Sequence, residues 1–381
     1  MYGMKPKHIL FLHTIAGGGH KSAAKAIIEA LDNIYGDDVT TEMVDALKDY
    51  APKPLDMAPE AYNQVIKAPQ LYKQFYDLGD GKRRSKLLTQ SISLYTRKAA
   101  DTMLKNHQAD AIVSTYHFAN APTLSALERL EHPAPFINVV TDMVTIPPVW
   151  FDARADATVV PTESAYHQAV IAGIPTERLH RIGLPVSPRF IPANNKDAVR
   201  RELGWPANRP IVLLMAGGAG VGPLGDLAEA IVESGLPATP VVVAGKNRRL
   251  AERLRKQDWA ENALIYDFVE DMPSFMQAAD VLITKAGPGT ITEALNTGLP
   301  MILYSRIPGQ EEGNVEYVTN TGAGYWTPKQ SDLIATLRYL LGDPDALARA
   351  TAAAKRLATP KASEKIARLI MKAATGHKTT K

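Results

Sequence analysis

Residues 8–31, HILFLHTIAGGGHKSAAKAIIEAL, contain the pattern that decides the fold. The apolar run at 8–13 predicts a β-strand, AGGGH at 16–20 predicts a glycine-rich loop, and the residues that follow have the apolar spacing of a helix. The pattern returns at 211–235, where IVLLMA is followed by GGAGVGPLG and DLAEAIVESG. The strand, loop and helix that open the chain therefore occur a second time in its second half.

Further strand-like runs alternate with helical stretches along both halves. Alternation of this kind predicts an α/β fold with parallel sheets, here as two Rossmann-like domains facing each other across a cleft. A segment with four prolines at 185–209 marks the connection between them. We expect domains at 1–190 and 209–360, a linker at 191–208, and a C-terminal helix and tail at 361–381. The further predicted strands are AIVST at 111, FINVV at 136, ATVV at 157, VVVA at 241, VLIT at 281 and MILY at 301.

The composition of the 381 residues excludes several classes of protein. There is no cysteine, which excludes disulfides, zinc–thiolate sites and thiol nucleophiles and favours the cytosol. The formal net charge of +3 gives no reason to expect a nucleic-acid partner. No apolar run near the start is long enough for a signal sequence or a membrane-spanning helix.

Residues 50–105 interrupt the alternation of strands and helices. Tyrosines and a phenylalanine are interleaved there with lysines and arginines, among them Arg83 and Arg84. Aromatic rings suit a lipid headgroup interface and cations suit anionic lipids, so the segment fits a peripheral membrane surface. A helical insertion with an ordinary solvated face fits the same spacing, and the sequence leaves both interpretations open.

Glycine loops between a strand and a helix let the backbone approach a phosphate closely. The spacing G-x-G-x-x-G at 220–225 also raises the possibility of a nicotinamide dehydrogenase. Two details disfavour it: Pro223 lacks an N–H donor inside the loop, and the next strand leads to Lys246, Arg248 and Arg249 instead of an acid for the adenosine ribose.

The segment TKAGPGTITEALN at 284–296 directly follows a predicted strand. Gly287 and Gly289 form a tight turn, Thr290 can cap the helix, and the Glu293 carboxylate can accept from both hydroxyls of a ribose. One segment could thus hold a nucleoside diphosphate, and the alternative is a capping-box-like helix start in which Glu293 only satisfies local amides. The later loop IPGQEEGN at 307–314 offers Gln310, Glu311 and Asn314 to sugar hydroxyls, or is a solvated turn.

Taken together, these segments resemble the monogalactosyldiacylglycerol synthases and, more distantly, bacterial processive diacylglycerol glucosyltransferases. The resemblance implies a GT-B fold, a UDP-sugar held mainly by the C-terminal domain, and a lipid acceptor approached from the N-terminal domain. The motifs that carry it are AGGGHKSAA at 16–24, VTDMVTIPPVWF at 140–151, PTE at 161–163, GLPV at 183–186, TKAGPGTITEAL at 284–295 and PGQEEGN at 308–314.

The resemblance also assigns roles to residues on the donor side. It implies that Glu293 binds the ribose, that Gln310 and Glu311 contact the donor sugar, and that the backbone at Phe268 and Val269 contacts uracil. Lys285 is the best-placed cation for the departing UDP, with Lys246 behind it. The remaining candidates for donor binding are Gly18, Gly19, Gly217, Gly218, Gly220, Gly287, Gly289, Thr290 and Asn314.

Attack by a lipid hydroxyl requires a base with a pKa near neutral on the face opposite UDP. His20 is the first candidate, and Asp142 is either the second candidate or the group that orients His20. A loop histidine that only binds a phosphate or a carbonyl remains the alternative for His20. The resemblance places Trp150 near the acceptor or an anionic lipid, and a buried packing tryptophan is the alternative.

The expected function is that of an inverting hexosyltransferase that uses a UDP-sugar and 1,2-diacylglycerol to make a glycoglycerolipid. Galactose is favoured over glucose as the donor sugar, and no obligate metal or other cofactor is expected. Expected partners are UDP-galactose or UDP-glucose, diacylglycerol and anionic membrane lipids, at the inner face of the cell membrane on the cytoplasmic side, and a homo-oligomer is left open. The alternatives are transfer to a polyprenyl-diphosphate-linked acceptor, a sugar-nucleotide epimerase on the same fold, and a non-catalytic UDP-sugar sensor.

Overall fold

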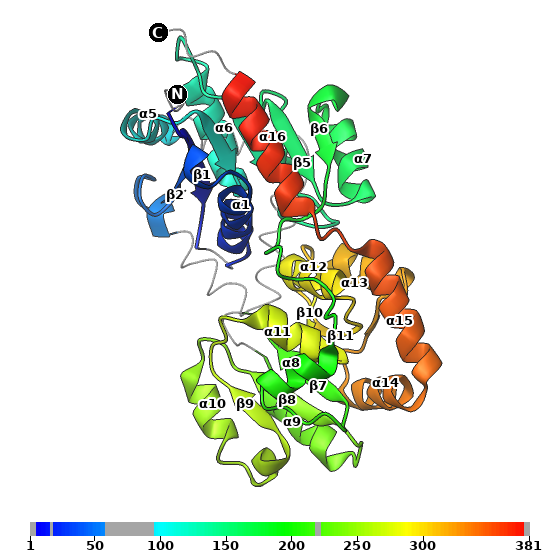
Figure 1. The fold of residues 1–381 in the computed structure, drawn as a ribbon. Helices are drawn as coiled ribbons and strands as arrows, with labels where there is room; N and C mark the ends of the chain where they lie inside the picture. The colour runs from blue at the N-terminus through cyan, green and yellow to red at the C-terminus, as the bar shows by residue number, and fades with distance from the viewer. Residues whose placement is uncertain (1–4, 16–17, 58–94, 218–221, 377–381) are drawn as a thin grey trace. The chain divides into compact units, whose positions relative to one another are not determined.

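The computed structural model describes residues 5–15, 18–57, 95–217 and 222–376. These residues form two compact units, each built on a parallel sheet with helices (Figure 1). Unit 1 comprises Met1–Pro188, Ile307–Gln310 and Lys361–Lys381, and unit 2 comprises Arg189–Arg306 and Glu311–Pro360.

In the described part of unit 1 the sheet has six parallel strands in the order β2-β1-β3-β4-β5-β6. Strands β3, β4 and β5 are buried along their whole length, as expected for a sheet covered by helices on both faces. Short apolar runs were the signal for these strands in the sequence. The strands are β1 (Lys7–His13), β2 (Val39–Asp45), β3 (Ala111–Ser114), β4 (Phe136–Val139), β5 (Ala157–Val160) and β6 (Leu179–Arg181).

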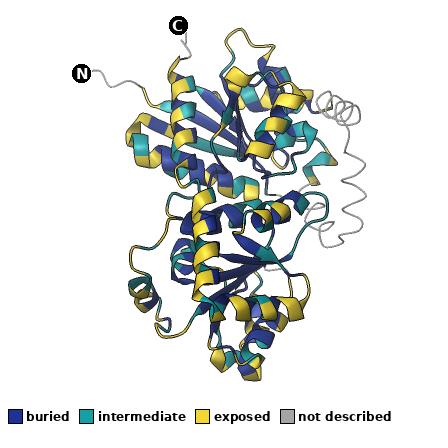
Figure 2. Cartoon of the chain, turned by 90° about the vertical axis from the view of Figure 1, so that its right-hand side faces the viewer, coloured by how far each residue is buried: buried dark blue, intermediate teal, exposed yellow. Residues whose placement is uncertain are grey.

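Alternate residues of β1 reach the two faces of this sheet. Ile9 and Phe11 pack in one apolar cluster with α1 and α16, whereas Leu10 and Leu12 pack in another with α5 and α6. Both faces are therefore closed by helices, and Figure 2 shows the buried strands between helices with exposed outer sides. The helices of unit 1 are α1 (Gly19–Tyr35), α5 (Arg97–Asn106), α6 (His117–Leu127), α7 (Glu163–Ala172) and α16 (Ala362–Gly376).

Helix α16 brings the last part of the chain into the core of unit 1. It lies beside α1 in Figure 1, and Ile366 and Ile370 pack in the same cluster as Ile27 and Leu31 of α1. Each of these four side chains is completely buried. Unit 1 therefore needs residues from both ends of the sequence.

Unit 2 has its own six-stranded parallel sheet within the described residues, in the order β12-β11-β10-β7-β8-β9. Val212 and Leu214 of β7 pack with α9, α14 and α15 in one apolar cluster. The strands are β7 (Ile211–Met215), β8 (Thr239–Val243), β9 (Leu264–Tyr266), β10 (Val281–Lys285), β11 (Met301–Ser305) and β12 (Gly324–Trp326). The helices are α8 (Lys196–Glu202), α9 (Leu224–Glu233), α10 (Arg248–Leu254), α11 (Met272–Ala278), α12 (Pro288–Thr297), α13 (Glu312–Asn320), α14 (Gln330–Gly342) and α15 (Pro344–Leu357).

The predicted α/β fold class with two Rossmann-like domains is confirmed by these two sheets. Within the described ranges, no helix has both the length and the apolar character needed to cross a bilayer. In both units the loops that follow the strands lie at the carboxyl edge of a parallel sheet, which is where ligands bind in folds of this kind.

Candidate active site

His20 lies at the start of α1, directly after the first glycine loop. Gly18 is the N-cap of α1 and has a left-handed backbone with φ of 77°. A side chain at Gly18 would meet no atom within 4 Å, so the backbone conformation alone explains the preference for glycine. Gly19 and His20 are the first two helical residues, and the imidazole of His20 is directed into unit 1.

Two oxygens fix the tautomer of His20. Its Nδ1 lies 2.8 Å from the carbonyl oxygen of Thr115 and 2.8 Å from Oγ1 of Thr141. Because a carbonyl oxygen can only accept, Nδ1 carries the hydrogen and donates it. The lone pair of the neutral imidazole is therefore on Nε2, which is the arrangement that a general base requires.

The surroundings of His20 favour its neutral form. Burial lowers the pKa of His20 below its ordinary value of 6.5, while the Asp142 carboxylate and the Thr115 carbonyl act in the opposite direction and His13 adds to the lowering. The net effect is a lowered pKa. An imidazole of this kind is uncharged at neutral pH and is able to accept a proton.

Asp142 follows β4 and is 5% exposed. The indole Nε1 of Trp150 donates to its Oδ2 at 2.6 Å, and the amide Nε2 of Gln310, in the segment grouped with unit 1, donates to Oδ1 at 3.0 Å. Since both carboxylate oxygens already accept a hydrogen bond, the geometry suits Asp142 to orientation and electrostatic support of His20 better than to abstraction of a proton.

Aromatic side chains enclose His20. The ring of Tyr116 lies 5.1 Å from the His20 ring, that of Trp150 6.1 Å and that of His117 6.2 Å, measured between centroids. The Trp150 side chain is 0% exposed and packs with Val140 and other residues of unit 1. Of the two interpretations of Trp150 that the sequence left open, the structure supports the buried packing tryptophan, because the ring is in contact with protein.

In unit 2, the predicted donor-binding residues follow neighbouring strands. Because the strands are parallel, the ends of β10, β7, β8 and β9 bring these residues to one edge of the sheet. Lys246 Nζ lies 6.0 Å from the ring centroid of Phe268, whose side chain is 55% exposed. Gly217 follows β7, Lys246 follows β8, Phe268 and Val269 follow β9, and Lys285 is the last residue of β10. Gly218, Gly220, Arg83 and Arg84 lie outside the described residues.

The turn at Gly287 begins helix α12. Gly287 is the N-cap and Pro288 the first helical residue, a position at which the missing N–H of proline has no cost. The prediction that Thr290 caps this helix is wrong, because Thr290 and Gly289 already lie inside its first turn. Within the described residues no side chain caps this end, so the backbone N–H groups of the first turn of α12 have no side-chain acceptor there.

Glu293 is the sixth residue of α12, too far along for the capping box that the sequence left open. Its side chain is half-buried, and burial raises the pKa of the carboxyl to about 7. A carboxyl group of this kind either donates or accepts at neutral pH. It is suited to a ligand that offers hydroxyl groups, which do both.

Helix α13 braces the turn before α12. The Asn314 amide donates to the Ala286 carbonyl at 2.9 Å and is 2% exposed, and a side chain at Gly287 would lie 3.8 Å from Oε1 of Glu311. The three residues predicted to surround one sugar thus differ in their surroundings: Asn314 supports the backbone, Glu311 adjoins Gly287, and Gln310 contacts Asp142.

Three residues near these sites were missed by the sequence analysis. Tyr116 and His117 follow β3, and their position after a buried strand was the available signal. Tyr304 in β11 is 7% exposed, its hydroxyl has no hydrogen-bond partner among the described residues, and a side chain at Gly222 would lie 2.4 Å from that hydroxyl. Position 222 therefore requires glycine because of the close approach of Tyr304.

Two family models match the chain, one in each half. Residues 20–186 match the monogalactosyldiacylglycerol (MGDG) synthase model, and residues 233–366 match the model of the glycosyltransferase family 28 C-terminal domain. The first match begins at His20 and contains Asp142 and Trp150. The second contains the turn at Gly287 and Glu293.

Curated relatives cover most of the chain. A probable chloroplastic monogalactosyldiacylglycerol synthase of Glycine max is 35% identical over 96% of this chain and 71% of the relative. Monogalactosyldiacylglycerol synthase 1 of Arabidopsis thaliana is 34% identical over 86% of this chain and 64% of the relative.

Solved structures support the fold. The crystal structure of Acinetobacter baumannii MurG has a TM-score of 0.64 and 18% identity, with 96% of this chain and all of that chain covered. The co-structure of Staphylococcus aureus MnaA with UDP has a TM-score of 0.62 and 14% identity, with 98% of both chains covered. Together with the two sheets, these likenesses identify a GT-B fold. The identity to the curated synthases carries the conclusion further: this chain is a glycosyltransferase of the monogalactosyldiacylglycerol synthase family.

Proposed function

We propose that this enzyme transfers galactose from UDP-galactose to 1,2-diacylglycerol with inversion at the anomeric carbon. The proposal is supported by the relatives named as MGDG synthases and by one observation in unit 1. That observation is the contact of His20 Nδ1 with the Thr115 carbonyl oxygen at 2.8 Å, which places the hydrogen on Nδ1 and the lone pair of the imidazole on Nε2.

The reaction follows as a single displacement. His20 Nε2 takes the proton of the diacylglycerol hydroxyl as that oxygen attacks the anomeric carbon. The bond from the anomeric carbon to the β-phosphate oxygen breaks, and the electron pair leaves with UDP. Asp142 stabilises the imidazolium that forms, and the hydrogen bond from Trp150 holds the carboxylate in place.

Unit 2 holds the donor in this proposal. The Glu293 carboxyl binds the ribose hydroxyls, the backbone at Phe268 and Val269 binds uracil, and the backbone N–H groups at the start of α12 face the diphosphate. Lys285, with Lys246, supplies positive charge to the leaving group, so no metal is required. Full activity in the presence of EDTA is the expected result.

The lipid acceptor requires access to a membrane. We propose peripheral binding to anionic lipid on the cytoplasmic side, based on the aromatic and cationic residues at 50–105, which include Arg83 and Arg84. Sedimentation with vesicles that contain phosphatidylglycerol, compared with vesicles of phosphatidylcholine alone, measures this directly.

A matrix of donors and acceptors tests the reaction. Purified protein is incubated with UDP-galactose, UDP-glucose or UDP-N-acetylglucosamine and with vesicles containing diacylglycerol or a polyprenyl diphosphate, and the products are identified by mass. The proposal expects hexosyl-diacylglycerol, with UDP-galactose the better donor. A product formed only on the polyprenyl diphosphate, or UDP binding without any product, would contradict it.

A further inference from the structure

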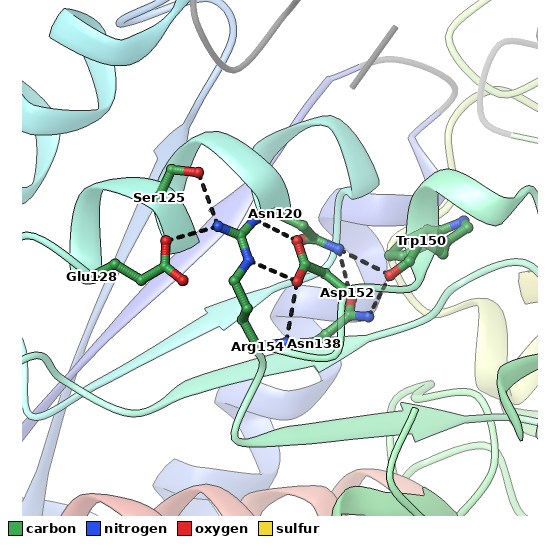
Figure 3. A network of polar contacts seen from close by, with 7 residues as sticks. All are labelled: Asn120, Ser125, Glu128, Asn138, Trp150, Asp152 and Arg154. Atoms are coloured by element: carbon green, nitrogen blue, oxygen red, sulfur yellow. Dashed lines mark hydrogen bonds and ion pairs between the residues drawn. The ribbon is translucent and has the colours of Figure 1, made fainter. Parts of the chain in front are cut away.

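Two asparagines meet in the interior of unit 1. Asn120 belongs to α6, Asn138 belongs to β4, and each is 1% exposed. The Asn120 amide donates to Oδ1 of Asn138 at 3.0 Å. Both amide nitrogens also donate to the backbone carbonyl of Trp150, Asn138 at 2.8 Å and Asn120 at 3.3 Å (Figure 3).

This arrangement is costly for a protein core. Buried amides destabilise unless all their polar atoms are paired, and Oδ1 of Asn120 has no partner within the described part of the chain. Apolar side chains of similar size would fill the same volume without that cost. The pair therefore requires an explanation other than packing.

The hydrogen bonds of Trp150 provide that explanation. At one end of the residue, two side-chain amides hold its backbone carbonyl. At the other end, its indole donates to Oδ2 of Asp142 at 2.6 Å. The residue is fully buried between these contacts, and its ring lies 6.1 Å from that of His20.

We propose that Asn120 and Asn138 are positioning residues of the transferase: they fix the backbone of Trp150 so that its indole holds the Asp142 carboxylate beside His20. The inference rests on the proposed role of His20 as the base. It assigns to the two asparagine amides a role in catalysis, in addition to the role of His20 as the base and that of Asp142 as the carboxylate beside it.

The charges around His20 give the inference a measurable consequence. Asp142 is the nearby carboxylate that favours the imidazolium, the Thr115 carbonyl acts in the same direction, and His13 acts against it. Burial lowers the pKa of His117 to about 3, so this ring stays neutral, and burial raises the pKa of Tyr116, which stays protonated. If Asp142 moves away, the pKa of His20 must fall.

The main test compares Asn138→Leu with Arg154→Met. Asn138→Leu keeps the volume and removes the donor to Trp150. Arg154→Met removes a neighbouring polar cluster that joins Asp152, Glu128 and Ser125 but leaves Trp150 untouched, as Figure 3 shows, and so controls for a general loss of stability. Each variant is assayed for kcat/KM against pH and for UDP affinity.

The inference expects a specific change in Asn138→Leu. The turnover number falls roughly tenfold, the acid limb of the pH profile moves to lower pH by about half a unit or more, and the Kd for UDP stays within about twofold of the parent. Arg154→Met retains the parent profile. An unshifted profile in Asn138→Leu, with turnover no lower than in Arg154→Met, would overturn the inference.

Two further measurements keep the test decisive. If Asn138→Leu fails to fold, Asn120→Ala removes the longer of the two bonds to Trp150 together with the bond to Asn138, and leaves the shorter bond from Asn138 to Trp150. It is expected to shift the profile in the same direction by a smaller amount. NMR titration of the labelled His20 imidazole reports its pKa without any assay of turnover. An inactive parent protein would count against the proposed function. An active parent protein, with the pKa of His20 unchanged in Asn138→Leu and in Asn120→Ala, would refute the positioning role alone.

Discussion

The indole nitrogen of Trp150 lies 2.6 Å from Oδ2 of Asp142, inside unit 1 where both side chains are buried. The hydrogen bond joins a residue on the loop after β4 to a short helical turn at Pro148–Trp150. It fixes the orientation of a carboxylate near His20, whose imidazole lone pair is on Nε2. The proposed base, His20, and the carboxylate that orients it, Asp142, therefore both belong to unit 1.

His20→Ala should lower kcat by about 100-fold or more and leave the Kd for UDP nearly unchanged, because a general base acts in the transition state and not in nucleotide binding. His107→Ala is the matched control, since His107 is another partly buried histidine of unit 1 whose partners are Glu42 and Tyr50. Stopped assays of both variants decide the point. A His20→Ala variant as active as His107→Ala would transfer the role of base to another group.

Trp150→Phe keeps an aromatic ring and removes the donor to Asp142. The expected loss of unfolding free energy is about 1–3 kcal/mol, since a buried carboxylate oxygen loses its partner, and turnover should fall with it. Trp205→Phe in unit 2 removes a comparable bond, from its indole to the Tyr266 hydroxyl at 2.8 Å. Denaturant unfolding and turnover are measured for both, and equal turnover in the two variants would refute a role for the Trp150 indole in catalysis.

Glu293 predicts a pH dependence of stability. Its pKa is raised by burial from 4.5 to about 7, so the folded state favours the protonated carboxyl, and the associated stability is present below pH 4.5 and is lost as pH rises through 7. The loss of unfolding free energy should be about 3 kcal/mol. Glu293→Gln should remove the decrease in unfolding free energy between pH 4.5 and 7. Glu316→Gln, at an exposed position on α13, should retain it. Identical slopes in the two variants would mean that Glu293 is not responsible.

Gly222→Ala places a methyl group against the Tyr304 hydroxyl, closer than van der Waals contact allows. Overpacking of this kind should destabilise the protein by about 1–3 kcal/mol. Tyr304→Phe removes a buried hydroxyl that has no partner in the described residues and should be neutral or stabilising alone. Thermal unfolding of the double variant should recover most of the loss, and additive losses would exclude the contact as the cause.

The sequence allowed the prediction of the eight inner strands of the two sheets that the described residues form, but of none of their edge strands. The inner strands contain continuous apolar runs because helices cover both faces of each sheet. These strands are β1, β3, β4, β5, β7, β8, β10 and β11. Strand β2, at one edge, mixes exposed and buried residues, and β6, β9 and β12 have three residues each. Short or half-exposed strands leave little periodic signal, so their positions depend on the neighbouring strand.

The sequence selected His20, Asp142 and Glu293 as site residues because their residue types and positions suit chemistry at strand ends, and their roles in binding and catalysis stay predictions. The helix start at Pro288 was misplaced at Thr290, since a proline that follows a glycine begins a helix as well as a capping threonine does. The burial of Trp150 and the contacts of Asn120 and Asn138 depend on three segments that meet only in the folded unit. No local sequence pattern therefore predicts these contacts.

A crystal structure with UDP bound tests the central claim most directly, because the proposed reaction requires the nucleotide to lie at the start of α12. The account predicts ribose hydroxyls within hydrogen-bonding distance of the Glu293 carboxyl and the diphosphate at the N–H groups that follow Gly287. Electron density for UDP at another place in unit 2, with Glu293 solvated, would contradict it.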